Sequence, residues 1–244
     1  MIIFGFSTRV SVGAVLLAVY FGISGARFDG TSNQILAGFI SGAGIIISIY
    51  LHELGHAICL RRYKLGVKEI VLHLVGGHTA MNRIPETPKQ AAVVSGIGPV
   101  VSGLLGVILL AAGSATDVQV IFYLGGINLI LAAINALPIS GFDGAGVLEA
   151  ALWKITKSRY GSRQKVATVS IFISAVAAGS GVSLFFAGSN GLFLLFVGVY
   201  LLYRSVQSRA GSQLLMLAEQ LPIENELRYG ICEFSSDDPI WYVR

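Results

Sequence analysis

Three residues in one short stretch of this chain could carry out hydrolysis. His52, Glu53 and His56 form a His-Glu-x-x-His pattern. On a helix, histidines four positions apart lie one turn apart on the same face, so both rings can bind one zinc ion. The glutamate beside the first histidine can then accept a proton from a water that zinc activates. The pattern predicts one zinc ion per chain, with His52 and His56 as ligands and Glu53 as the catalytic base.

The surroundings of this pattern place it in a membrane rather than in a soluble enzyme. Apolar residues dominate 45–50 and 57–60 on its two sides. Of the 244 residues, 54% are hydrophobic and 12% are charged, against roughly 25% charged in a typical soluble domain. Ionisable side chains inside an apolar segment are costly and usually functional. The two cysteines, Cys59 and Cys232, lack metal-ligand spacing and predict no disulfide framework.

The hydropathy pattern predicts an all-α polytopic membrane protein. Helices of about 20 apolar residues cross a bilayer, and six apolar segments come near that length. A short membrane-associated β-hairpin is expected between the second and third helices. The expected helices cover residues 11–24, 33–60, 91–113, 118–137, 166–187 and 191–203, within a membrane domain of residues 1–204 followed by a C-terminal tail of residues 205–244.

The basic residues predict how the chain is oriented. If all six segments span and the N-terminus is cytoplasmic, every Lys and Arg except Arg27 lies on the cytoplasmic side, as the positive-inside rule requires. Both termini are then cytoplasmic. This asymmetry explains the net charge of +4 without a nucleic-acid partner. The zinc would lie roughly 10 Å inside the cytoplasmic face, from the helix rise of about 1.5 Å per residue.

The polar connection of residues 64–90 contains the expected hairpin. Residues 67–75 turn from amphipathic to apolar and β-branched, which predicts a strand, and Gly76-Gly77 predicts a tight turn. Such a hairpin beside a membrane site can accept an extended substrate by strand pairing. His73 and His78 are interpreted as lining the site rather than as ligands. The expected substrate-binding residues here are Leu72, Leu74, Val75, Gly76, Gly77 and His78.

A third zinc ligand is expected in the loop after Pro138. Asp143 lies there on the cytoplasmic side, and a site with two histidines needs another donor. The alternative is an ordinary turn aspartate in Asp-Gly, in which case Glu149 is the substitute ligand. Asn135 could donate a hydrogen bond to the substrate or to a developing oxyanion. Asn128, on the same helix face, is expected either to contact substrate or to form an inter-helix hydrogen bond.

Together these motifs resemble the site-2 protease family of intramembrane zinc metalloproteases. The resemblance rests on residues 52–56, Gly76-Gly77, Gly98-Pro99, residues 135–138 and Asp143-Gly144, and covers about residues 35–150. The resemblance implies that His52, His56 and Asp143 bind zinc. It also implies that Glu53 is the base and that Asn135 binds the substrate. Relatives often have Gly-Gly-Arg after the aspartate, whereas this chain has Gly144-Ala145-Gly146.

The motifs thus predict a zinc metalloendopeptidase that cuts a membrane-protein substrate in or near a transmembrane segment. This is the chemistry of regulated intramembrane proteolysis, and we expect it in a multi-pass protein of a prokaryotic cell membrane. The expected partners are a transmembrane protein substrate and the lipid bilayer. Two alternatives are a zinc-binding membrane protein that does not cut and a metal or ion transporter. A transporter often shows matching halves, and the zinc motif occurs once.

Overall fold

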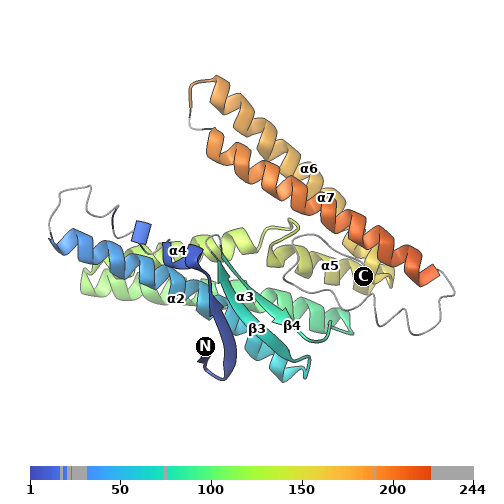
Figure 1. Cartoon of the computed structure of the whole chain (residues 1–244), viewed down its shortest axis with the longest axis horizontal. Helices are drawn as coiled ribbons and strands as arrows, with labels where there is room; N and C mark the ends of the chain where they lie inside the picture. Colours follow the sequence, from blue (N-terminus) through green and yellow to red (C-terminus); the bar gives the residue numbers. More distant parts are fainter. Residues whose placement is uncertain (17–18, 21–22, 24–31, 74–75, 190, 221–244) are drawn as a thin grey trace. The chain divides into compact units, whose positions relative to one another are not determined.

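A computed structural model describes residues 1–16, 19–20, 23, 32–73, 76–189 and 191–220. The chain forms two compact units, Met1–Leu137 and Pro138–Arg244, which are described in turn (Figure 1).

The first unit is built on three long helices, α2 (Ser32–Arg62), α3 (Pro88–Thr116) and α4 (Gln119–Asn135). Thr87 caps α3 by accepting a hydrogen bond from the backbone N–H of Gln90. Proline at the first helical position costs no hydrogen bond there, so the Thr-Pro pair fixes where α3 begins. All three helices pack against one another, and the packing brings α2 beside α3 along the His-Glu-x-x-His segment.

A four-stranded sheet completes the first unit. Its strands are β1 (Ile2–Ile3), β2 (Phe6–Val10), β3 (Val67–His73) and β4 (Gly76–Met81), and they are ordered β1-β2-β3-β4. β3 and β4 form the antiparallel hairpin that the sequence predicted. β2 pairs parallel to β3, with Arg9 opposite Val71. The N-terminal strands were missing from the prediction, so the expectation of a hairpin alone was incomplete.

The sheet lies against α2 and forms a core with it. Apolar side chains from the two layers bury one another between them. The buried members of this core are Phe6, Ile70 and Leu72 from the sheet, Tyr50 and Ala57 from α2, and Ala14 from the segment after β2. The Tyr50 hydroxyl also donates to the carbonyl of Ile3 at 3.1 Å. The helix that carries the histidines is therefore fixed to the sheet both by apolar packing and by a hydrogen bond.

The second unit contains α5 (Asp143–Thr156), α6 (Arg159–Phe186) and α7 (Leu192–Gln220). α6 and α7 form a long antiparallel pair (Figure 1). They approach closely: a Cβ on Gly198 would lie 2.7 Å from the Cα of Ala178. Small residues allow membrane helices to pack in this way.

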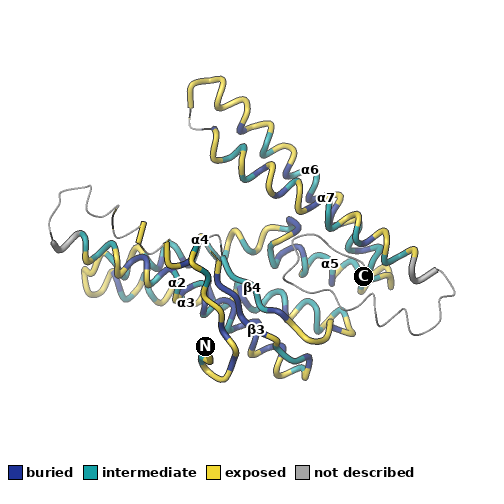
Figure 2. The backbone as a smooth tube through the Cα atoms, in the orientation of Figure 1, coloured by how far each residue is buried: buried dark blue, intermediate teal, exposed yellow. Residues whose placement is uncertain are grey.

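Helix length and composition confirm a mainly helical membrane protein with a small sheet. Among the described residues, three helices are long and apolar enough to cross a membrane: Ile35–Arg62, Pro88–Thr116 and Arg159–Phe186. Many of their apolar residues are exposed, and exposed positions are drawn in yellow along these helices in Figure 2. α4 is apolar but shorter.

The count of six spans remains an expectation. Part of the expected first span, residues 11–24, lies outside the described residues, namely residues 17–18, 21–22 and 24. The expected sixth span ended at residue 203, whereas α7 continues to Gln220. The expected domain boundary after residue 204 therefore falls within a continuous helix.

Candidate metal centre

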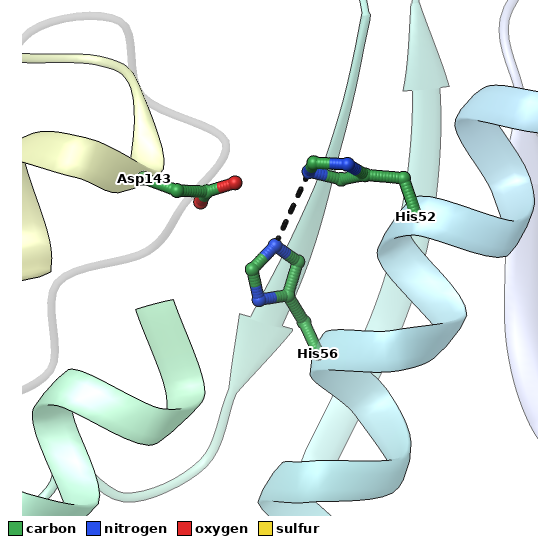
Figure 3. A group of neighbouring side chains, drawn as sticks. All are labelled: His52, His56 and Asp143. Atoms are coloured by element: carbon green, nitrogen blue, oxygen red, sulfur yellow. Dashed lines mark hydrogen bonds between the residues drawn. The ribbon is translucent and has the colours of Figure 1, made fainter. Parts of the chain in front are cut away.

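The two histidines of the His-Glu-x-x-His pattern point their Nε2 atoms at one another. His52 and His56 lie one turn apart on α2, and their Nε2 atoms are 3.3 Å apart (Figure 3). Two ligands of a tetrahedral zinc, each about 2.0–2.1 Å from the ion, lie about 3.3–3.4 Å from each other. Both rings are buried. The pair therefore has the separation that two ligands of one zinc ion require.

Hydrogen bonds on the other side of each ring hold this orientation. Nδ1 of His56 lies 2.7 Å from the carbonyl oxygen of Val94 on α3. A carbonyl only accepts, so Nδ1 carries the proton and the Nε2 lone pair is available for a metal. Nδ1 of His52 lies 2.9 Å from the hydroxyl of Ser102, also on α3. Partners of this kind fix the tautomer and orientation of metal-binding histidines.

Gly98 leaves space in front of the two Nε2 atoms. A Cβ built on Gly98 would lie 2.6 Å from Nε2 of His52 and would also collide with Nε2 of His56. The absence of a side chain at this position of α3 therefore creates a cradle that both ring nitrogens face. The donor chemistry, the Nε2 separation and this cradle all fit a zinc ion.

Glu53 contacts β4 of the hairpin. Its side chain is buried, and the Thr79 hydroxyl lies 2.8 Å from its Oε2 and 3.0 Å from its backbone carbonyl oxygen. Gly77 lies on the same strand, where a Cβ would come within 2.6 Å of Cγ of Glu53. β4 therefore contacts the carboxylate directly.

The structure adds Thr79 and Ser102 to the residues that the sequence singled out. Neither belongs to a recognisable motif, and their partners are 26 and 50 positions away in the chain. The only sequence signal was the Gly-Gly pair that placed a hairpin near Thr79.

Asp143, the third side chain drawn in Figure 3, is the first residue of α5 in the second unit. An acidic residue is favourable in the first turn of a helix. The loop before it is held by α6: the backbone N–H of Ser140 donates to the Ser170 hydroxyl at 2.9 Å, and that hydroxyl contacts the carbonyl of Pro138 at 3.3 Å.

Glu149, the substitute ligand in the sequence prediction, lies six residues after Asp143 on α5. Burial raises the pKa of its carboxyl above the ordinary value, and the positive charges of Arg163 and Arg159 offset part of that rise. Burial therefore has the larger effect on the Glu149 carboxyl, and the basic start of α6 has the smaller one.

The two asparagines of α4 have different environments. Asn128 is fully buried, and its amide nitrogen donates to the Ser48 hydroxyl on α2 at 2.8 Å, as expected for an inter-helix hydrogen bond. Asn135 is half-buried at the last position of α4, where its amide nitrogen donates to the carbonyl of Leu131 at 2.9 Å.

The remaining expected site residues belong to the hairpin. Leu72 is buried on β3, and Gly76, Gly77 and His78 lie on β4. The His78 ring stacks on that of His73 with centroids 5.3 Å apart. Leu74 and Val75 lie outside the described residues.

These features define a helical membrane protein with a histidine pair arranged for a divalent metal. The model of Peptidase family M50 matches residues 114–179. A solved structure, the site-2 protease from Methanocaldococcus jannaschii, aligns with a TM-score of 0.63 and 22% identity, over 86% of this chain and 93% of that chain. That likeness shows the same fold.

Curated relatives carry names of the same kind. A protein of Synechocystis, sll0528, whose name gives it as a zinc metalloprotease, is 30% identical over 226 residues, which are 86% of this chain and 58% of the relative. MJ0392, a zinc metalloprotease of Methanocaldococcus jannaschii, is 33% identical over 116 residues, 45% of this chain and 33% of the relative. The Rip3 protein of Mycobacterium tuberculosis, whose name gives it as a zinc metalloprotease, is 29% identical over 193 residues, 72% of this chain and 49% of the relative. The chain thus spans about half the length of these relatives or less. Together these matches confirm the resemblance to the site-2 protease family that the motifs indicated.

Proposed function

We propose that this chain is an intramembrane zinc metalloprotease that hydrolyses a peptide bond in or beside a transmembrane segment of another protein. The observation that carries the proposal is the convergence of the His52 and His56 Nε2 atoms at 3.3 Å in an apolar helix, with Glu53 next in sequence. The fold likeness and the names of the relatives support the same activity.

The proposed zinc ligands are His52, His56 and Asp143. A catalytic zinc has three protein ligands and one position for water or substrate. Two imidazoles and a carboxylate form such a set, and each of these residues offers one ligand atom. Asp143 contributes from the start of α5, where the loop anchored by Ser170 fixes its backbone.

The proposed mechanism is addition of water to the scissile carbonyl. When bound, zinc supplies Lewis-acid polarisation of that carbonyl and lowers the pKa of water. The Glu53 carboxylate takes one proton from the attacking water as its oxygen bonds to the carbonyl carbon. Glu53 then gives that proton to the leaving amine nitrogen as the C–N bond breaks. Asn135 is proposed to hold the substrate backbone through the amide hydrogen that its bond to Leu131 does not use.

The proposed substrate site is the outer edge of β4. β4 is the last strand of the sheet, so this edge is not paired with another described strand. A helical substrate hides its backbone amides and must unwind before it can be cut. Pairing with β4 would offset part of that cost by restoring backbone hydrogen bonds. Gly76, Gly77 and His78, all on β4, would contact the extended segment, and the same role is proposed for Leu74 and Val75. Leu72 is not part of this edge, because it is buried in the core against α2 and is paired with both β2 and β4.

The proposed orientation has both termini in the cytoplasm. The placement of Lys and Arg in the sequence supports it. Single cysteines at exposed positions on opposite ends of α3, Lys89 and Thr116, in a variant without the two native cysteines, would test it. A membrane-impermeant maleimide added to intact cells should label the Thr116 position and spare the Lys89 position. The reverse pattern would contradict the orientation.

The proposed activity is tested by comparing cell membranes that contain the wild-type chain with membranes that contain Glu53→Gln. Mass spectrometry of protein N-termini should find new termini within or beside apolar segments only with the wild type. Identical sets of termini in the two membranes would contradict the proposed function.

A further inference from the structure

Thr79 makes a contact that a purely structural threonine would not need. Its hydroxyl lies within hydrogen-bonding distance of two acceptors on one residue, the Oε2 atom and the backbone carbonyl of Glu53, at 2.8 and 3.0 Å. A bond to the carbonyl alone would be enough to attach β4 to α2. The bond to Oε2 fixes where the carboxylate itself lies.

The strand also restricts Glu53 at a second point. Gly77 has no side chain, and a Cβ there would lie 2.6 Å from Cγ and 3.1 Å from Oε1 of Glu53. Thr79 and Gly77 are two positions apart on β4, so they face the same side of the sheet. The position of β4 therefore determines the conformation of the Glu53 side chain through one hydrogen bond and one close contact.

The same strand lies at the edge of the sheet. Thr79 is opposite Ile70 of β3, and the outer edge of β4 is not paired with another described strand. Only one side of β4 is thus held by backbone hydrogen bonds. A strand added to the outer edge would hold both sides, and with them the Thr79 hydroxyl.

We propose that Thr79 is a positioning residue that couples substrate pairing on β4 to the placement of the Glu53 carboxylate. This inference rests on the proposed proteolytic function and deepens it. An extended substrate on the edge of β4 immobilises the strand, and Thr79 transmits that order to the base. Unwound substrate is then cut efficiently because its own pairing completes the site.

The first test compares Thr79→Val, which keeps the shape and removes the hydroxyl, with Thr79→Ser, which keeps the hydroxyl. The control is Thr116→Val, which removes an exposed hydroxyl bonded to Ala112 at the far end of α3. The probe is a quenched fluorescent peptide in detergent micelles, with about 20 leucine and alanine residues around a central Gly-Ala-Gly and lysines at both ends.

We expect Thr79→Val to lower kcat about 10- to 100-fold, since a misplaced catalytic group costs up to about 100-fold. KM should change less than twofold, and zinc content by mass spectrometry should not change. Thr79→Ser should recover most of the kcat, and Thr116→Val should match the wild type. An unchanged kcat in Thr79→Val, or a loss explained by missing zinc, would overturn the positioning role.

The second test addresses the coupling. A peptide N-methylated at alternate residues beside Gly-Ala-Gly cannot pair fully with a strand edge. With the wild type, the N-methylated peptide should have a lower kcat and a higher KM than the unmethylated peptide. With Thr79→Val, the kcat values of the two peptides should differ less than twofold. Equal losses of kcat in both proteins would refute the coupling. In zinc-free protein, hydrogen exchange of the β4 amides should be faster in Thr79→Val than in Thr79→Ser. Equal exchange rates in the two variants would contradict the proposed link between β4 and Glu53.

The two levels of the proposal fail differently. Equal cleavage by the wild type and Thr79→Val would refute the coupling through Thr79 but not the proteolytic function. Equal cleavage by the wild type and Glu53→Gln would refute the proposed proteolytic function, and with it the inference about Thr79.

Discussion

The hydroxyl oxygen of Ser102 lies 2.9 Å from Nδ1 of His52 and is fully buried between α2 and α3. Metal binding through Nε2 requires that Nδ1 carry the proton, and this hydroxyl can accept the hydrogen bond that Nδ1 then donates. His56 is fixed in the same way by a backbone carbonyl, which no substitution can remove. Ser102 is therefore the side chain through which the orientation of the metal centre can be tested.

Replacing Ser102 by alanine should weaken zinc binding about tenfold or more, because partners of metal-binding histidines contribute roughly 10- to 100-fold in affinity. Competition with a fluorescent zinc chelator measures the change. Ser41→Ala is a matched control, since that hydroxyl also lies on a long helix of the first unit and bonds only within its helix. An affinity equal to that of the wild type would show that Ser102 does not orient His52.

A methyl group at Gly98 should prevent zinc binding. In Gly98→Ala the new Cβ would occupy the space between the two Nε2 atoms, 2.6 Å from that of His52. Metal analysis of the purified variant should find little zinc while its circular dichroism remains helical. Gly103→Ala on the same helix is the control, because its Cβ would meet nothing nearer than 3.9 Å. Full zinc occupancy in Gly98→Ala would mean that the metal lies elsewhere.

The raised pKa of Glu149 should make the stability of the folded chain depend on pH. Burial raises the pKa of this carboxyl above its ordinary value near 4.5, with Arg163 and Arg159 acting in the opposite direction. A raised folded-state pKa means that the folded state binds the proton more tightly. The associated stability is present below the unfolded-state pKa and is lost as pH rises through the folded-state value.

Glu149→Gln should therefore match the Tm of the wild type near pH 4 and exceed it at pH 8, as measured by thermal unfolding in detergent. Glu86→Gln, which replaces an exposed carboxylate outside the helices, should show no such divergence. A lower Tm for Glu149→Gln at pH 8 would instead mean that attraction to the two arginines outweighs burial.

Local patterns in the sequence predicted much of this fold. The apolar runs located α2, α3, α4, α6 and α7, and the Gly-Gly pair located the β3–β4 hairpin, because each feature depends on neighbouring residues. β1 and β2 escaped prediction because both are short and β1 pairs only with β2. β2 in turn pairs with β3, some 60 positions away, where Arg9 of β2 forms an ion pair with Glu69 of β3 at 3.1 Å.

The residues of the site likewise fall into those that local spacing predicted and those that it did not. His52, Glu53 and His56 were evident because their spacing of one helical turn is itself the signal. Ser102 and Thr79 were not, because a serine in a membrane helix and a threonine in a strand have no distinctive spacing. Their roles appear only when α3 and β4 are packed against α2.

The central claim is that Glu53 performs proton transfer at a zinc site within a membrane helix. Its most direct test is the cleavage rate of the model peptide by purified wild type and Glu53→Gln in proteoliposomes, with zinc measured in the same samples. We predict one zinc per chain in both proteins, cleavage by the wild type, and a loss of at least about 100-fold in Glu53→Gln, the usual contribution of a general base. Equal cleavage by the two proteins at equal zinc content would contradict it.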